Sequence, residues 1–238
     1  MKTPLEVVAH PSPNFGARRG GALPDMIVLH YTAMQSCAAA RDRLCAPEFE
    51  VSAHYLIGER GEVLRLVAEE QRAWHAGAGC WGAVTDVNSR SIGIELANCG
   101  AAPFPEAQMR ALEALLADIM TRHRIAPERV IGHSDMAPGR KVDPGARFDW
   151  RRLARQGLSV WPQRIGLAQG TAQTADMGEF LTAARRFGMT ARVAPDTLLA
   201  AFRLRFRPQA TGALSPIDLA MARDLAARFP VDRGYGSP

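Results

Sequence analysis

This 238-residue sequence has almost no lysine, no paired-cysteine motif and no long apolar run. Only Lys2 and Lys141 are lysines among its 29 lysine and arginine residues, so Lys141 departs from the chain's general use of arginine. The four cysteines form no C-x-x-C pair, which excludes a zinc ribbon and a thioredoxin-type redox site. Their number does not decide between free thiols and disulfides.

Segments for membrane insertion or export are also missing. No apolar stretch approaches the roughly 20 residues of a membrane span. Residues 1–14 lack the apolar core and small-residue cleavage site of a signal peptide. The printed sequence therefore predicts no transmembrane segment and a cytoplasmic location. A periplasmic or outer-membrane-associated chain from which an export signal had been removed would look the same.

Composition and charge are those of an ordinary globular protein. Hydrophobic residues make up 47% and charged residues 22% of the chain, and the formal net charge is +5. A small basic excess suits an anionic partner. The charges are spread out and form no run of like sign, so we predict no nucleic-acid partner.

Apolar patterning predicts an α/β fold in the first two thirds of the chain, after an irregular lead-in over residues 1–25. Short apolar, β-branched runs predict strands over residues 26–31, 52–57, 62–67, 91–96 and 129–132. The second and third of these are expected to form a hairpin around the turn 58–61. Helical spacing of apolar residues predicts one long helix over 105–124. A loop rich in Pro and Gly is expected over 133–145. Together these elements predict a mixed central sheet flanked by helices.

The last third of the chain has a different pattern. Residues 166–171 are typical of a linker, and three amphipathic segments follow, which predict a small three-helix bundle. Asp196 and Ser215 are expected as N-caps, with Pro216 at a first helical position. We therefore predict two domains, a catalytic domain over residues 1–164 and a helical domain over residues 165–238.

Two histidines and an aspartate are candidate metal ligands. His30 follows the run MIVL, His133 follows VIG, and Asp143 lies ten residues further along the same loop. Two imidazoles and one carboxylate with an open fourth position would suit a catalytic Zn²⁺ ion. Each histidine taken alone is more commonly a hydrogen-bonded core residue, so the proposal depends on the three converging.

Two further ionisable residues are candidates for catalysis. Glu95 is the acid in the apolar strand SIGIEL, where an unpaired carboxylate is costly unless it faces a cleft or a cation. Such a glutamate can take a proton from the attacking water, although an edge-strand glutamate facing solvent is the alternative. Lys141 precedes Asp143 by two residues, and its ammonium could stabilise an oxyanion, unless it is a solvated surface lysine.

Aromatic and histidine side chains next to the hairpin are candidates for substrate binding. Trp74 and His75 lie in the glycine-flanked segment AWHAG, a combination typical of a sugar or peptide groove. His54 in SAHY has strand character, and a substrate contact and a packing role are both open for it.

The motifs in their order resemble one enzyme family. MIVLHYT, SAHYLIG, AWHAG, SIGIEL, GHSDMAP and RKVDPG occur in the order found in the type-2 N-acetylmuramoyl-L-alanine amidases. The HYTA segment and the C-terminal helices are most similar to the AmiD branch, in which a small peptidoglycan-binding-like helical module follows the catalytic domain. Each fragment alone is weak, but six ordered segments are specific.

This resemblance implies a function and a set of site residues. It implies a zinc-dependent amidase that cleaves the bond between the lactyl group of muramic acid and L-alanine in peptidoglycan or muropeptides, for cell-wall turnover or recycling. Position by position, the family's zinc ligands fall on His30, His133 and Asp143. Its catalytic glutamate falls on Glu95 and its lysine near the metal on Lys141. Substrate contacts are expected from Tyr31, His54, Trp74 and His75.

Three rival functions differ in what they predict. A non-catalytic recognition module would lack at least one of the three ligands, and all three are present. A zinc hydrolase with another substrate shares the same metal site, so the sequence does not separate it from an amidase. A structural zinc site is usually cysteine-rich with four ligands, unlike this one.

Overall fold

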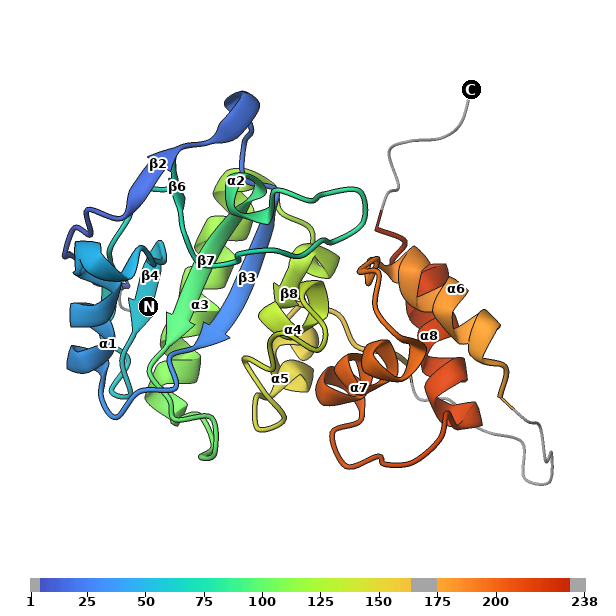
Figure 1. Cartoon of the computed structure of the whole chain (residues 1–238). Coiled ribbons are helices and arrows are strands. Elements are labelled where there is room, and N and C mark those ends of the chain that lie inside the picture. Colours follow the sequence, from blue (N-terminus) through green and yellow to red (C-terminus); the bar gives the residue numbers. More distant parts are fainter. Residues whose placement is uncertain (1–4, 164–174, 232–238) are drawn as a thin grey trace.

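The computed structural model describes residues 5–163 and 175–231, which form a central sheet with helices on both faces (Figure 1). The six-stranded sheet has the order β1-β5-β4-β7-β3-β8, and β2 pairs separately with β6. Within the larger sheet β4 and β5 are antiparallel and the other neighbours are parallel, which confirms the predicted mixed sheet. The strands are β1 Val7–Ala9, β2 Phe15–Ala17, β3 Met26–Tyr31, β4 Tyr55–Ile57, β5 Val63–Arg65, β6 Gln71–Ala73, β7 Ser91–Leu96 and β8 Val130–Gly132.

The helices divide into one long helix, four shorter ones near the sheet and the three of the bundle. They are α1 Cys37–Cys45, α2 Val87–Arg90, α3 Glu106–His123, α4 His133–Met136, α5 Trp150–Arg155, α6 Met177–Phe187, α7 Pro195–Phe206 and α8 Pro216–Arg228. Ser215 caps α8 by accepting the backbone N–H of Asp218, as predicted. The predicted N-cap at Asp196 is wrong. Helix α7 begins at Pro195 with Ala194 as its N-cap, so Asp196 already lies in the first turn of the helix.

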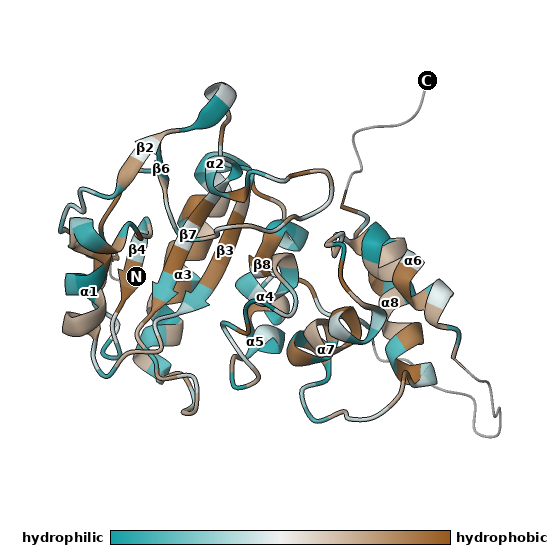
Figure 2. Cartoon of the chain, viewed as in Figure 1, coloured by the Kyte–Doolittle hydropathy of each residue, from teal (hydrophilic) through white to brown (hydrophobic). Residues whose placement is uncertain are grey.

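Alternation along β3 explains how the sheet is covered. Successive side chains of a strand point to opposite faces. Ile27 and Leu29 pack with the apolar face of α3, while Met26 and Val28 belong to the cluster on the other side. Apolar residues therefore face both layers, and β3, β7 and β8 are hydrophobic along most of their length (Figure 2). His30 lies on the same face as Met26 and Val28, away from α3.

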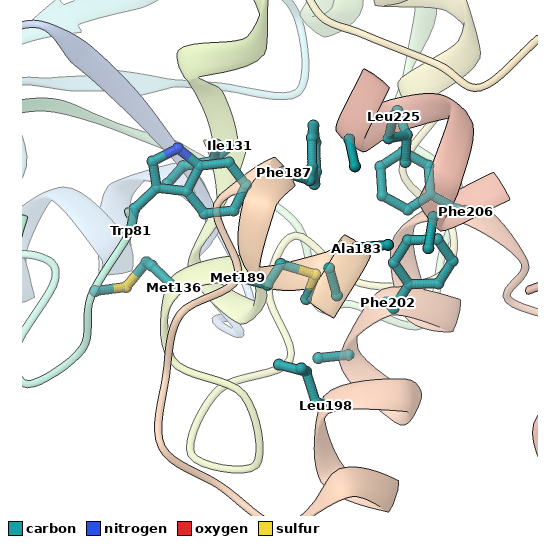
Figure 3. Packing of buried hydrophobic residues seen from close by; sticks show 14 of the residues in the cluster. Trp81, Ile131, Met136, Ala183, Phe187, Met189, Leu198, Phe202, Phe206 and Leu225 are labelled. Carbon is teal, nitrogen blue, oxygen red and sulfur yellow. The ribbon is translucent and has the colours of Figure 1, made fainter. Parts of the chain in front are cut away.

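The C-terminal helices complete this second face. Phe187 of α6 and Phe202 of α7 belong to one buried cluster with Ile131 and Met136 from the sheet side, and Trp81 packs edge-to-face on Phe187 (Figure 3). The bundle and the sheet thus share a continuous core. The predicted linker 166–171 lies outside the described residues, so the domain boundary at 164 stays a prediction.

A buried ion pair joins the bundle to the sheet. Arg205 of α7 donates to Asp135 of α4 at 2.5 Å, and each side chain is 1% exposed. The guanidinium also lies 4.1 Å from the ring of Trp150. Asp135 accepts the backbone N–H of Gly132 as well, so this pair holds the corner from which His133 projects.

Some sequence expectations need correction. The lead-in was expected to be irregular, but it contains β1 and β2, each only three residues long, which is too short for a repeating pattern to mark a strand. The loop expected over 133–145 begins instead with α4. The hairpin is confirmed, although its strands β4 and β5 are shorter than predicted. All four cysteines are free. No helix within the described residues has the length and hydropathy to cross a membrane.

Candidate metal centre and active site

Three adjacent parallel strands place their carboxyl ends side by side. His30 is the next-to-last residue of β3, Glu95 is the next-to-last residue of β7, and His133 follows β8 directly. β3 lies between β7 and β8 in the sheet, and His30 is in register with Glu95. The carboxyl end of a parallel sheet is where α/β proteins usually bind their ligands, and here it gathers the predicted ligands and the predicted acid.

The three predicted metal ligands converge. The Nδ1 atoms of His30 and His133 are 2.9 Å apart, and Asp143 Oδ2 lies 2.9 Å from the first and 3.0 Å from the second. All three side chains are buried. Two imidazole nitrogens and a carboxylate oxygen form a nearly equilateral triangle, the donor set that a catalytic zinc site uses.

The hydrogen bond made by Nε2 of His133 shows that its other ring nitrogen, Nδ1, is an acceptor. His133 Nε2 lies 2.8 Å from the carbonyl oxygen of Ala76, which can only accept, so Nε2 carries the hydrogen. In the neutral ring Nδ1 is then a bare lone pair aimed at His30 and Asp143. Acceptors grouped this closely can hold a cation between them, and a partner on the second ring nitrogen is the usual support of a metal-bound histidine.

Backbone contacts hold Asp143 beside the histidines. Its carbonyl accepts the backbone N–H of Ser134, one residue after His133. Gly132 has no side chain, and a Cβ there would come within 2.8 Å of the ring of Pro144. The loop after Asp143 can therefore lie directly against the end of β8.

The pKa shifts of His30 and Asp143 favour the protonation states that bind a cation. Burial and the neighbouring His133 lower the pKa of His30 to about 4, so its imidazole is neutral near pH 7. Burial alone would raise the pKa of Asp143, but the proximity of His133 and His30 outweighs this and holds it well below its usual range. Metal binding needs neutral imidazole and ionised carboxylate ligands, and these shifts provide the first at His30 and the second at Asp143.

Glu95 has the properties of a general base. Burial, and then repulsion from Asp143, raise its pKa to about 8, while Lys141 acts in the opposite direction. Its Oε2 atom is buried and has no hydrogen-bond partner among the described residues. A carboxyl with a strongly raised pKa beside a candidate metal site is characteristic of catalytic acids and bases.

A cavity of about 410 Å³ opens over the cluster. Its lining includes most of the predicted site residues, namely His30, Tyr31, Trp74, His75, Glu95, His133, Lys141 and Asp143. Lys141 is exposed at the cavity. The ring of Tyr31 lies against Gly100 and Gly145, whose φ angles are +83° and +82°. Two loops with these glycines leave room for the ring beside the site.

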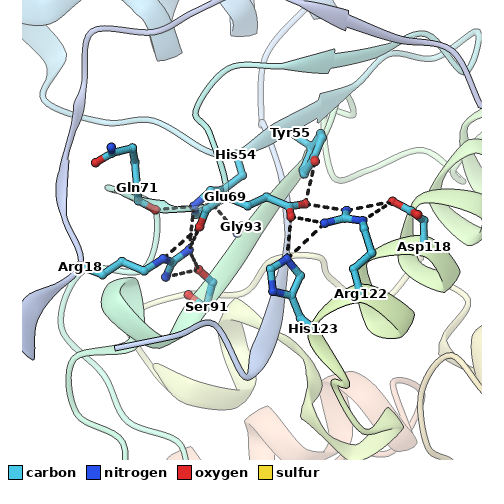
Figure 4. A network of polar contacts seen from close by, with 10 residues as sticks. All are labelled: Arg18, His54, Tyr55, Glu69, Gln71, Ser91, Gly93, Asp118, Arg122 and His123. Carbon is cyan, nitrogen blue, oxygen red and sulfur yellow. Dashed lines mark hydrogen bonds and ion pairs between the residues drawn. The ribbon is translucent and has the colours of Figure 1, made fainter. Parts of the chain in front are cut away.

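His54 does not reach this cavity, which contradicts the prediction that it contacts substrate. It is 0% exposed. Its Nδ1 accepts the backbone N–H of Gly93 and its Nε2 donates to the carbonyl of Gln71 (Figure 4). Burial, followed by the nearby Arg18 guanidinium, lowers its pKa to about 3. His54 is therefore a neutral histidine that joins the segment before β4 to β7.

A second polar network, centred on Glu69 near His54, joins helix α3 to the sheet. Buried Glu69 accepts hydrogen bonds from Arg122 and from Tyr55, at 2.7 Å for the tyrosine hydroxyl, and His123 contacts the same carboxylate (Figure 4). These bonds tie α3 to the strands and lower the pKa of Glu69 to about 2 against the effect of burial. His123 carried no signal in the sequence because its partner is 54 residues away.

Sequence reasoning missed several side chains around the site. Arg43 and Arg140 also line the cavity. Arg140 donates to the carbonyl of Ala76 at 2.6 Å, so it supports the loop that receives His133. Ser91 lies below the site and contacts His75. Its position could have been found, because Ser91, Gly93 and Glu95 alternate along one face of β7.

A buried cluster of two histidines and an aspartate, beside a carboxyl of raised pKa at the mouth of a cavity, is typical of metal-dependent hydrolases. Comparison with known proteins narrows this class. A family model described as N-acetylmuramoyl-L-alanine amidase matches residues 20–146. The chain is 38% identical over 214 residues to N-acetylmuramoyl-L-alanine amidase AmiD of Escherichia coli, covering 77% of this chain and 75% of that protein. The chain therefore belongs to the N-acetylmuramoyl-L-alanine amidase family, whose members are hydrolases acting on amide bonds.

Solved structures agree with this assignment. The complex of E. coli AmiD with anhydro-N-acetylmuramic acid-L-Ala-D-γ-Glu-L-Lys aligns with a TM-score of 0.77 and 32% identity, covering 91% of this chain and 98% of that one. AmpDh3 of Pseudomonas aeruginosa with anhydromuramic pentapeptide gives a TM-score of 0.76 and 31% identity, over 92% and 95% of the two chains. Both matches extend over most of the sheet and helical segments, which confirms the predicted fold and the resemblance to AmiD.

Proposed function

We propose that this protein is a zinc-dependent amidase that cleaves the bond between the lactyl carbonyl of muramic acid and L-alanine in anhydro-muropeptides or peptidoglycan. The triangle formed by His30 Nδ1, His133 Nδ1 and Asp143 Oδ2 carries the proposal. The substrate follows from the ligands named for the AmiD and AmpDh3 complexes. The same substrate class supports a role in cell-wall turnover or recycling.

His30, His133 and Asp143 would hold the zinc ion and leave its cavity side open. When bound, zinc supplies a Lewis acid that acidifies a water molecule and polarises the amide carbonyl. The rigid strand ends and buried hydrogen bonds described above would fix the three ligand atoms before the ion arrives, which limits the reorganisation that binding requires.

Glu95 and Lys141 would carry out the proton transfer and charge stabilisation. Glu95 would accept a proton from the attacking water on its carboxylate and later donate it to the departing L-alanine nitrogen. The raised pKa of Glu95 supports the second step, because the group holds a proton readily near neutral pH. The Lys141 ammonium, exposed at the cavity, would stabilise the negative charge that forms on the attacked carbonyl oxygen.

The direct test is to identify the broken bond. The protein is incubated with anhydro-N-acetylmuramic acid-L-Ala-D-γ-Glu-L-Lys, with and without a chelator, and the products are analysed by mass spectrometry. We expect anhydromuramic acid and an intact tripeptide, formed only without chelator, and no product from His133→Ala. Cleavage within the tripeptide would indicate a peptidase, and binding without cleavage would indicate a recognition module. The cytoplasmic location predicted from the sequence stays a proposal, to be checked by fractionation of native cells.

A further inference from the structure

His75 occupies a defined position behind the metal cluster, although its segment is a loop. Its ring lies between His30 and Ser91, with His75 Nδ1 3.0 Å from His30 Nε2 and His75 Nε2 3.2 Å from Ser91 Oγ. The backbone N–H groups of His75 and Ala76 both donate to Asn88 Oδ1, at 3.1 and 2.9 Å. Both ring nitrogens are therefore engaged by the protein, and neither is left for a substrate.

Glycine at position 93 is needed for this arrangement. A Cβ on Gly93 would lie 2.4 Å from Cγ and 2.7 Å from Nδ1 of the His75 ring. Such distances are far below contact distance, so the ring rests directly on the backbone of β7. The ring of His75 meets that of His30 in an edge-to-face arrangement at an interplanar angle of 79°.

The hydroxyl of Ser91 fixes the direction of every hydrogen bond in this chain. Ser91 Oγ lies 2.6 Å from the carbonyl oxygen of Val87, which can only accept, so the single hydroxyl hydrogen is used there. Toward His75 the same oxygen can then only accept, and His75 Nε2 must carry the hydrogen. In the neutral ring His75 Nδ1 is consequently an acceptor, and it receives the hydrogen of His30 Nε2.

The consequence for His30 is a fixed tautomer. With its hydrogen on Nε2, His30 presents a bare Nδ1 toward His133 and Asp143. His133 reaches the same state by donating Nε2–H to the carbonyl of Ala76. The two ligands are thus oriented by different acceptors, a backbone oxygen for His133 and a histidine nitrogen for His30.

We propose that His75 is a positioning residue that accepts the Nε2 hydrogen of His30 and so commits His30 Nδ1 to the metal, rather than a substrate contact. This role rests on the proposed zinc function, because it assigns to His75 the orientation of one zinc ligand, His30. Partners on the second nitrogen of a ligating histidine typically change metal affinity about 10- to 100-fold when they are lost.

A matched pair of substitutions separates this role from simple packing. In His75→Asn the amide oxygen can take the place of Nδ1 and accept from His30, although the side chain is smaller. In His75→Leu the side chain is closer to the imidazole in bulk and offers no acceptor. Zinc affinity is measured for wild type and both variants by competition with a chromophoric chelator, after circular dichroism has shown each to be folded.

We expect His75→Leu to bind zinc about 10- to 100-fold more weakly than wild type and His75→Asn within about threefold of it. Equal zinc affinity of wild type and His75→Leu would overturn the proposal while leaving the zinc amidase function intact. Weaker binding by His75→Asn than by His75→Leu would also overturn it, because packing would then be the cause. Absence of zinc binding by the wild type would instead refute the proposed function.

A second measurement needs no variant to fold. Long-range proton–nitrogen correlation spectra of zinc-loaded wild-type protein, labelled at its six histidines, report which ring nitrogens carry a hydrogen. We expect His75 to carry it on Nε2 and His30 on Nε2. A hydrogen on His75 Nδ1 would contradict the proposed direction of the chain.

Discussion

His30 and Glu95 are cross-strand partners in the sheet, aligned in register between the parallel strands β3 and β7. Partners on adjacent strands project from the same face, so the candidate metal ligand and the candidate base are set side by side by backbone pairing. The spacing between ligand and base is therefore a property of the sheet rather than of a loop. Asp143, Lys141 and His75 reach the site from loops, and Asp143 is buried there.

Replacing Glu95 by Gln should abolish most turnover without releasing the metal. The amide keeps the shape of the carboxyl but cannot accept the proton of water, so we expect kcat to fall by about 10²- to 10⁴-fold. Zinc content, measured by elemental analysis, should match wild type because Glu95 is not among the three converging ligands. A variant with near-wild-type kcat would show that Glu95 is not the base.

The same substitution should stabilise the metal-free protein at high pH. The folded-state pKa of Glu95 is about 8, above its value in an unfolded chain, so the folded protein holds an extra proton between about pH 4.5 and 8 and loses stability as pH rises through this window. Relative to wild type, Glu95→Gln should gain nothing below pH 4.5 and on the order of 5 kcal/mol at pH 9, because the pKa rises from 4.5 to about 8 and each pKa unit is worth about 1.4 kcal/mol.

Urea denaturation of both metal-free proteins at pH 5, 7 and 9 measures this gain. Comparing variant with wild type cancels the titration of the other buried groups. A difference in the free energy of unfolding that is constant with pH would mean that Glu95 is not forced into an unfavourable charged state.

Lys141 should affect turnover more than zinc binding. It is exposed at the cavity, so removing its charge should not disturb the fold. We expect Lys141→Met to lower kcat by about 100-fold, as loss of one oxyanion donor does, and Lys141→Arg to lower it less. Arg147→Met is the control, because it removes an exposed cation from the same loop outside the cavity. If both Lys141 variants kept full activity, Lys141 would be a surface lysine.

Arg205→Leu should destabilise the protein strongly. The substitution leaves the buried carboxylate of Asp135 without its cation, and breaking a buried pair costs about 3–5 kcal/mol. Arg223→Leu, in the same bundle, breaks an ion pair with Glu179 whose side chains are 58% and 54% exposed, and should cost less than about 1 kcal/mol. Equal effects of the two substitutions on thermal unfolding would show that Arg205 does not anchor the bundle.

The sequence predicted the parts of the site that lie on strongly patterned elements. β3 and β7 have the predicted bounds because apolar, β-branched runs mark them clearly. His30 was therefore placed correctly at a strand end, and Glu95 correctly within a strand. Ser215 was found as a cap because the S-P-x-D pattern is local.

The parts that were missed depend on tertiary contacts. The burial of His54 follows from its bonds to Gly93 and Gln71, which no local pattern reveals. Likewise the role proposed for His75 depends on Ser91 and Val87. The short strands β1 and β2 are held by pairing with β5 and β6, and three residues are too few for a local pattern to reveal them.

The central claim is that His30, His133 and Asp143 hold one zinc ion on which amide cleavage depends. Titration of metal-free protein with zinc tests this claim most directly. Release of peptide from the anhydromuramoyl tripeptide should be absent without metal, rise linearly with added zinc and stop rising at one ion per chain. His133→Ala should show no such rise at the same zinc concentrations. Wild-type rates from the metal-free protein, or recovery without a break at one equivalent, would contradict the assignment.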